Sequence, residues 1–237
     1  MENNKEKSIG EKYIIQTKNV VQAFPVAGGE FTALKGIDID IPAHKLTVLR
    51  GRSGSGKTTL MNILGGLDYP KSGEVLFDGK DIVKMSENAR EKLRKQKVGF
   101  VFQSVALIPM MNAYENVEFA LRLAGYKGDM VARAKQCLEM VGLGKRMKHM
   151  PQELSGGEQQ RVAIARAIAH KPEIIFADEP TAELDTNTGI QVIKIFKKLT
   201  EDEKITIIMT THDTGLMEAA ECIYELEDGR IVENEEE

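Results

Sequence analysis

The chain has 237 residues, 42% hydrophobic and 29% charged, a composition typical of a soluble globular protein with a sizeable core. Its 32 basic and 36 acidic residues give a net charge of −4, which disfavours a protein whose main ligand is nucleic acid. Two distant cysteines, with no CxxC pair, exclude a disulfide scaffold and a cysteine-based zinc finger and fit a reducing cytosol. The charged N-terminus predicts no secretory signal, and no apolar stretch reaches the roughly 18 residues of a membrane helix.

Short apolar, β-branched runs alternate along the chain with stretches of helical periodicity. The expected strands are 13–17, 46–49, 98–102, 174–177 and 205–210, and the expected helices are 58–64, 86–96, 114–124, 129–141, 161–169 and 186–199. This alternation predicts an α/β domain over 13–232 with a largely parallel sheet. Helices without a convincing strand predict a helical insertion over about 104–171, within a core of 13–103 and 172–232. We expect tails at 1–12 and 233–237.

A glycine-rich loop between an expected strand and helix is the first motif with chemical content. It reads Gly51-Arg52-Ser53-Gly54-Ser55-Gly56-Lys57-Thr58, which fits GxxxxGK[ST]. Glycines let backbone N–H groups surround an anion, the following helix directs its positive end at the same phosphates, and the lysine adds a charge. The threonine hydroxyl suits Mg²⁺. A chance match occurs in about one chain in a hundred of this length, and the strand–loop–helix context makes chance still less frequent.

An acidic pair follows the apolar run 174–177. In parallel sheets ligands bind beyond the carboxyl ends of the strands, where Asp178 and Glu179 fall. Asp178 suits a Mg²⁺ role, and Glu179 can orient an attacking water and accept its proton. Pro180 is expected to hold Glu179 in an extended conformation. Alone, the pair is equally consistent with ordinary acids in a turn or helix cap.

A second glycine motif, Leu154-Ser155-Gly156-Gly157-Glu158-Gln159-Gln160, precedes an alanine-rich helical pattern. Ser155 and Glu158 form an S-x-x-E capping box, which is a sufficient structural explanation for those two residues. It does not explain the two glycines, which weaken a first helical turn. They predict a second helix terminus that faces phosphate, completing an ATP site of another subunit.

The order of these motifs resembles the nucleotide-binding subunit of ATP-binding cassette (ABC) transporters over nearly the whole chain. Gln103 matches the glutamine loop, 183–185 the D-loop and His212 the switch histidine. The resemblance implies a P-loop NTPase (RecA-like) core with a mainly parallel sheet, an N-terminal antiparallel β region and a helical insertion subdomain.

In that family two subunits pack head to tail around two ATP molecules. The resemblance implies adenine stacking by Phe24 and phosphate binding by the loop that ends in Thr58 and Thr59, with Mg²⁺ held by Thr58, Gln103 and Asp178. It implies catalytic roles for Glu179, His212 and Gln103. Contacts across the dimer would come from Ser155, Gly156, Gly157, Glu158 and Asp185. Taken singly, Phe24 also fits a core residue and His212 a structural one. The sequence departs from the usual family pattern at Glu158 and Glu183.

Segments 60–68 and 103–117 are similar to the lipoprotein-releasing and macrolide-export branch, whose relatives include a cell-division ATPase. That resemblance implies a membrane permease as partner. Leu107, Ile108, Met110 and Met111 would form an apolar contact surface, although core packing explains them equally well. The basic residues Arg90, Lys92, Arg94, Lys95 and Lys97 are expected to form a solvated helix face, with a phospholipid-facing patch as the weaker alternative.

The sequence therefore predicts an ATP- and Mg²⁺-dependent ATPase subunit on the cytoplasmic face of a membrane, where a permease holds it. It would dimerise around ATP and drive export, lipid or lipopeptide extraction, or drug resistance. The alternative is a mechanical signalling ATPase that moves a membrane partner and transports nothing. A soluble ABC ATPase acting on ribosomes or DNA is disfavoured, since such proteins usually fuse two cassettes or carry a long coiled-coil insertion.

Overall fold

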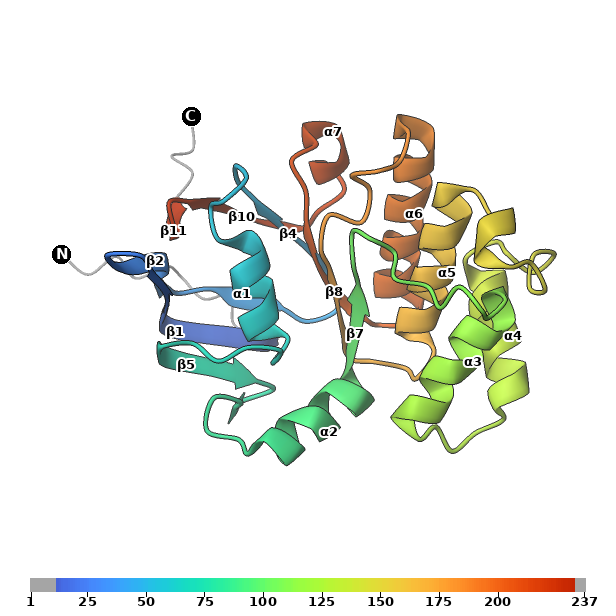
Figure 1. The fold of residues 1–237 in the computed structure, drawn as a ribbon, viewed down its shortest axis with the longest axis horizontal. Helices are drawn as coiled ribbons and strands as arrows, with labels where there is room; N and C mark the ends of the chain where they lie inside the picture. Colours follow the sequence, from blue (N-terminus) through green and yellow to red (C-terminus); the bar gives the residue numbers. More distant parts are fainter. Residues whose placement is uncertain (1–11, 233–237) are drawn as a thin grey trace.

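A six-stranded, mainly parallel sheet forms the centre of the computed structural model, which describes residues 12–232 (Figure 1). Its order is β11-β10-β4-β9-β8-β7. The strands are β4 (Leu46–Arg50), β7 (Val98–Val101), β8 (Ile174–Ala177), β9 (Thr206–Thr210), β10 (Cys222–Glu227) and the antiparallel β11 (Arg230–Val232). Because the other strands run parallel, their carboxyl ends meet at one edge of the sheet.

Both faces of this sheet are buried, which accounts for the unbroken apolar runs in its strands. Along β8, Ile174 and Phe176 pack on one face and Ile175 and Ala177 on the other. The first face meets α1 (Lys57–Leu64) and a second sheet. The opposite face meets α5 (Gly156–Ile168) and α6 (Thr186–Asp202).

The second sheet is antiparallel and lies beside α1 (Figure 1). It contains β1 (Tyr13–Val26), β2 (Gly29–Ile37), β3 (Asp40–Pro42), β5 (Ser72–Phe77) and β6 (Lys80–Asp81). The α/β fold with an N-terminal antiparallel region is thus confirmed, although β1 extends well beyond the expected strand 13–17. Register shifts against β2 break its alternation, so the sequence pattern shows only its first part.

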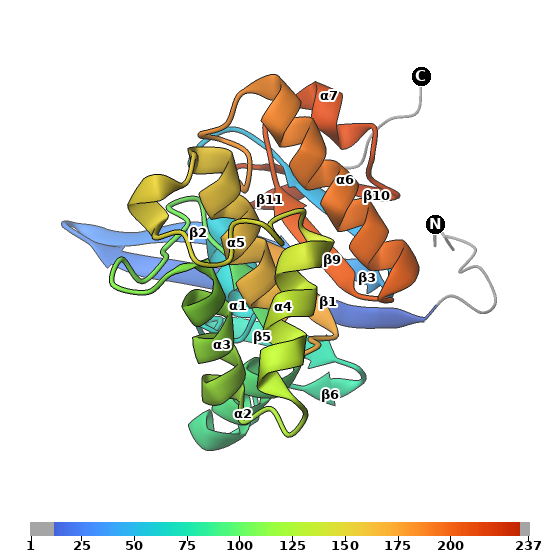
Figure 2. The same ribbon diagram turned by 90° about the vertical axis from the view of Figure 1, so that its right-hand side faces the viewer.

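Between β7 and β8, residues 102–173 form helices and loops without a strand. The helices are α3 (Ala113–Ala124), α4 (Met130–Met140), a 3₁₀ turn (Pro151–Glu153) and α5. Helices α3, α4 and α5 lie side by side in Figure 2 and share one buried cluster. The remaining helices are α2 (Glu87–Lys97), which Ser86 caps as expected, and the short α7 (Thr214–Met217).

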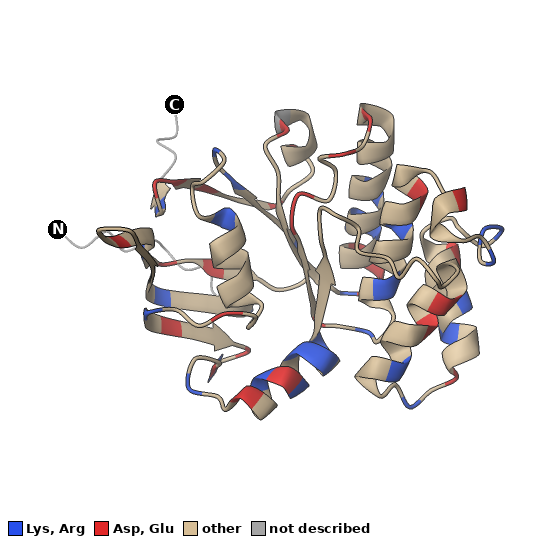
Figure 3. Ribbon diagram, in the orientation of Figure 1, with Lys and Arg blue, Asp and Glu red and all other residues tan. Residues whose placement is uncertain are grey.

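The basic residues of α2 gather towards its C-terminal end (Figure 3). The expectation of a solvated face is wrong for Arg90, which is 2% exposed. Its guanidinium lies 3.5 Å from the centre of the Tyr69 ring and donates a hydrogen bond to the Asp68 carbonyl at 2.6 Å. A charge count cannot reveal this, because the turn that receives the arginine is about 20 residues earlier in the chain.

The tails expected at 1–12 and 233–237 lie outside the described residues, apart from Lys12. The Lys12 carbonyl accepts a hydrogen bond from the Ala43 N–H at 2.8 Å, and its ammonium lies 3.0 Å from Asp78. Lys12 is therefore anchored to the antiparallel sheet.

Candidate active site

The glycine-rich loop joins β4 to α1, so the strand–loop–helix context expected for it is present. Gly51 has φ +150°, and a Cβ there would lie 2.2 Å from the Leu226 carbonyl oxygen. Only glycine therefore fits between the loop and β10. The buried Lys57 ammonium donates hydrogen bonds to the carbonyls of Gly51 at 2.8 Å and Arg52 at 3.0 Å. The loop thus encircles a positive charge at the start of α1.

Asp178 lies directly opposite this loop, one residue beyond β8. The Thr58 hydroxyl donates to Asp178 Oδ2 at 3.0 Å, and the Thr210 hydroxyl donates to Asp178 Oδ1 at 2.7 Å. The structure therefore brings together Thr58 and Asp178, which the sequence suggested as a pair of Mg²⁺ ligands. Their hydroxyl and carboxylate oxygens are the hard donors that Mg²⁺ prefers, so the residues present fit that ion.

Thr210 is a site residue that sequence reasoning did not single out. It is fully buried at the end of β9 and also accepts a hydrogen bond from the Glu179 N–H at 2.7 Å. One hydroxyl thus holds both acids of the pair. Threonine is common in strands, so the residue type alone carried no signal. Its place at the carboxyl end of an apolar strand, two residues before His212, could have revealed it.

Glu179 is left-handed rather than extended, so the expected conformation is wrong. Its φ is +44°, and its carbonyl accepts a hydrogen bond from the Ala182 N–H at 3.2 Å. The following proline disfavours the right-handed helical region but leaves the left-handed one accessible, and the tight turn selects it. A non-glycine residue held there carries strain, which is common at functional sites.

Two cavities meet at Glu179. One, of about 210 Å³, is also lined by Thr211 and His212, and the His212 Nδ1 atom lies 4.0 Å from a Glu179 carboxylate oxygen. The other, of about 270 Å³, is lined by the phosphate loop and Phe24. Glu179 therefore stands between His212 and the place where phosphates would bind.

Phe24 lines one cavity of this site, whereas Gln103 lines neither of the two. Phe24 is 38% exposed and lines the larger of these two cavities, which argues against a core role. Gln103 is exposed, two residues beyond β7. The Val101 carbonyl, at the end of β7, accepts a hydrogen bond from the Asp178 N–H at 2.9 Å. Gln103 therefore comes shortly after a strand that ends at the same edge of the sheet as the acids.

The second glycine motif begins α5, as the capping box predicted. The Ser155 hydroxyl accepts the Glu158 N–H at 3.3 Å, and the Ser155 N–H donates to the Glu158 carboxylate at 2.9 Å. The hydrogen bond from the Ser155 N–H, together with the positive charge of the Arg146 guanidinium 3.2 Å away, lowers the pKa of the Glu158 carboxyl.

Asp185 caps the start of α6. Its carboxylate accepts a hydrogen bond from the Thr188 hydroxyl at 2.6 Å, and the hydrogen bonds from Thr188 lower the pKa of the Asp185 carboxyl.

Comparison with known proteins agrees with this geometry. The family model for ABC transporters matches residues 34–182. The chain belongs to the ABC transporter family. This cassette is 48% identical over 221 residues to the ABC transporter ATP-binding protein MJ1508 of Methanocaldococcus jannaschii, covering 93% of this chain and 98% of that one. The resemblance read from the sequence motifs is thereby confirmed.

The cassette falls in the branch that the sequence indicated. It is 42% identical over 220 residues to the lipoprotein-releasing system protein LolD of Syntrophus aciditrophicus, covering 92% of this chain and 99% of LolD. It is also 42% identical over 221 residues to the macrolide export ATP-binding/permease protein MacB of Syntrophobacter fumaroxidans. That match covers 92% of this chain but only 31% of MacB.

A solved structure shares the fold of the cassette. The ATP-binding cassette MJ0796, solved as a dimer in a post-hydrolysis state with ADP and Pi, superposes with a TM-score of 0.85 at 40% identity. The match covers 92% of this chain and 97% of that one. Among residues 12–232 of this cassette, no helix has the length and apolar character needed to cross a membrane.

Proposed function

We propose that this chain is the energy-supplying subunit of an ABC transporter complex, which closes into a dimer around two ATP molecules and drives a membrane permease. As a cassette of the LolD and MacB branch, it binds and hydrolyses ATP and works with a second cassette and a permease. The observation that carries the proposal is the convergence of the Lys57 loop, the Thr58–Asp178 pair and Glu179 at one sheet edge.

Lys57 and the loop amides bind the triphosphate, and ADP is a good leaving group once that charge is compensated. Glu179 orients a water molecule and takes its proton, while the water oxygen forms a bond to the γ-phosphorus and the bond to the β–γ bridging oxygen breaks. His212, beside Glu179, donates a hydrogen bond to the γ-phosphate. Thr58, Asp178 and Gln103 would hold Mg²⁺, which when bound supplies further charge compensation.

The second glycine motif completes the ATP site of the partner cassette. Within one chain, α1 and α5 lie on opposite sides of β7 and β8 (Figure 1), so α5 does not begin at its own phosphate loop. The exposed Gly156 at the start of α5 leaves backbone N–H groups accessible to an anion. Ser155, Gly157, Glu158 and Asp185 would contact the nucleotide held by the partner.

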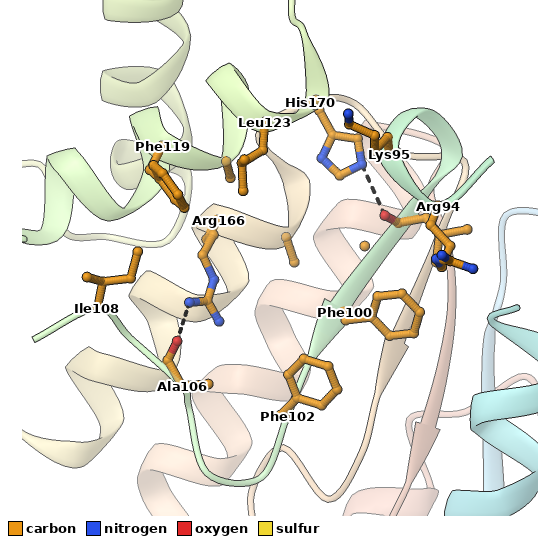
Figure 4. Close-up of a pocket in the computed structure, with 15 residues that line it drawn as sticks. Arg94, Lys95, Phe100, Phe102, Ala106, Ile108, Phe119, Leu123, Arg166 and His170 are labelled. Atoms are coloured by element: carbon orange, nitrogen blue, oxygen red, sulfur yellow. Dashed lines mark hydrogen bonds between the residues drawn. The ribbon is translucent and has the colours of Figure 1, made fainter. Parts of the chain in front are cut away.

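The permease binds at a groove between α2, β7 and the helices of residues 104–171. A cavity of about 370 Å³ there has an apolar lining that includes Phe100, Phe102 and Leu123 (Figure 4). The side chain of Ile108 faces it from the segment that the sequence assigned to the partner contact. A helix of the permease would bury its apolar face in this groove from the cytoplasmic side.

The proposal is tested by Glu179→Gln, which keeps the size of the side chain but removes the base. ATP affinity should stay within about twofold, turnover should fall at least about 100-fold, and a stable ATP-dependent dimer should appear in light scattering. Glu173→Gln, at the opposite end of β8, is the matched control and should turn over normally. If Glu179→Gln hydrolyses ATP at the wild-type rate, Glu179 is not the base. If the unmodified protein hydrolyses ATP but remains a monomer throughout, the proposed ATP-dependent dimer is wrong.

A further inference from the structure

Two large aromatic side chains stand exposed on neighbouring strands at the edge of the phosphate site. Phe24 on β1 is 38% exposed and Phe31 on β2 is 56% exposed. Single exposed apolar residues need no explanation, but these two are direct cross-strand partners. Directly paired residues in an antiparallel ladder project from the same face, so the two rings form one aromatic surface.

This aromatic surface belongs to the ATP cavity. Phe31 and Phe24 both line the cavity of about 270 Å³ that also contains Gly54 and Lys57, and Ala33 of β2 continues its wall. The polar side chains of that cavity, Ser53, Lys57, Thr58, Thr59 and Glu179, come from the phosphate loop, the start of α1 and the end of β8. The cavity thus has a charged part for phosphates and an aromatic part for an apolar group.

We propose that Phe31 is a second contact for the nucleotide base, beside the stacking position of Phe24. The inference rests on the proposed ATP site and adds to it a residue for which the motifs gave no role. Cross-strand partners have Cβ atoms about 5 Å apart, whereas a base held flat between two rings needs about 7 Å. Phe31 therefore packs against the edge of the base and the ribose, while Phe24 covers its face.

The geometry also sets the kind of selectivity at this position. Aromatic contact selects for surface area, and a purine offers more of it than a pyrimidine. We therefore expect ATP and GTP to bind within about tenfold of each other and CTP to bind more weakly than both.

The test compares ATP with inorganic tripolyphosphate, which has the phosphates but no base, by calorimetric titration of the whole chain. Phe31→Ala should raise the dissociation constant for ATP about 5- to 50-fold and leave tripolyphosphate binding unchanged. Phe31→Leu should recover part of the affinity for ATP. Phe24→Ala combined with Phe31→Ala should lose less than the product of the single effects, because both side chains contact one base.

Val26→Ala is the matched control, since Val26 is 51% exposed near the end of β1 and does not line the cavity. It should bind both ligands normally. Unchanged ATP affinity in Phe31→Ala, or equal loss for ATP and tripolyphosphate, overturns the role of Phe31 but leaves the ATP site intact. A wild-type chain that binds tripolyphosphate and not ATP overturns both this role and the proposed function.

Discussion

Thr210 determines the positions of both acids that follow β8. Its hydroxyl donates to Asp178 and accepts from the Glu179 N–H, each at 2.7 Å. The hydroxyl hydrogen is committed to the carboxylate, so the same oxygen has a lone pair free for the amide. This pair of contacts fixes the left-handed turn that places Glu179 between the phosphate loop and His212.

Thr210→Val is expected to lower kcat for ATP hydrolysis about tenfold and to leave the KM within about threefold. Valine keeps the volume of threonine but leaves the Glu179 N–H and one Asp178 oxygen without their partner, at a cost of about 1–3 kcal/mol in unfolding free energy. ATPase kinetics and urea unfolding measure the two effects separately.

Thr206→Val is the matched control, at the opposite end of β9. Thr206 is also fully buried, and its hydroxyl accepts the His44 N–H at 2.8 Å. This variant should lose similar stability but keep its kcat. A similar fall in kcat in both variants would mean that general loosening of β9, rather than the position of the acids, limits turnover.

Some features of individual site residues could be predicted from the sequence, and others could not. The placement of the phosphate loop, Asp178 and Glu179 at one sheet edge was predictable, because each motif is contiguous and directly follows a strand. The conformation of Glu179 and the burial of Arg90 were not predictable. They depend on Thr210 and on the Asp68–Tyr69 turn, which are distant in sequence.

At the scale of elements, the two glycines that begin α5 have different structural requirements. A Cβ on Gly157 would lie 2.2 Å from Thr188 Cγ2 of α6, whereas a Cβ on Gly156 would have Leu184 Cδ2 as its nearest neighbour, at 4.0 Å. Packing between α5 and α6 therefore explains Gly157. Packing within the chain does not explain Gly156, which agrees with the proposed anion site at this helix terminus.

Gly157→Ala should destabilise the chain by about 1–3 kcal/mol, because the new methyl group forces α5 and α6 apart. Gly156→Ala should raise stability by up to about 1 kcal/mol, since alanine is the better helix former and has room there. If Gly156 provides access to phosphate, the same variant should nevertheless weaken ATP-dependent dimerisation. Urea unfolding and light scattering with ATP distinguish these effects.

Thr188→Ser provides the rescue for Gly157→Ala. Serine removes the methyl group that the new Cβ would strike and keeps the hydroxyl that donates to Asp185. The double variant should regain most of the lost stability. No regain would mean that the glycine is needed for its backbone and not for the contact between the helices.

Elements with strong local signals were predictable, and those fixed by distant partners were not. The parallel strands are buried on both faces, so their apolar runs identify them without context. The second half of β1 has mixed polarity and two register shifts, and its pairing with β2 comes from backbone hydrogen bonds that no residue pattern records.

At the scale of the whole molecule, the proposed catalytic residues and the proposed permease surface lie on different parts of the chain. The Lys57 loop and the acids lie at the edge of the parallel sheet, whereas the helices of residues 104–171 carry the proposed permease groove (Figures 1 and 4). Residues 102–106 connect the two, because they directly follow β7. The Arg166 guanidinium of α5 donates to the Val105 carbonyl at 3.0 Å and to that of Ala106. Motion of α5 would therefore reach the segment that begins near Gln103.

The four apolar residues assigned to the permease contact differ in their surroundings. Leu107 is half-buried and packs on the core cluster of α3, α4 and α5, so core packing accounts for it. Met110 is 86% exposed, which leaves its side chain available to a partner. Sequence alone could not separate the two, because both lie in one apolar run and their burial depends on how the loop meets α3.

Met110→Asp should therefore impair assembly with the permease without affecting the isolated cassette. A charge on an exposed side chain changes folding by less than about 0.5 kcal/mol, but a charge that a bound partner covers must lose its hydration. Leu107→Asp should instead lower the unfolding free energy by about 2–4 kcal/mol. The two variants are compared by urea unfolding and ATPase rate of the purified chain, and by the fraction recovered with membranes of the native host. Met110→Asp should show normal unfolding and ATPase but reduced membrane recovery. Full membrane recovery in a folded Met110→Asp chain would exclude Met110 from the permease contact.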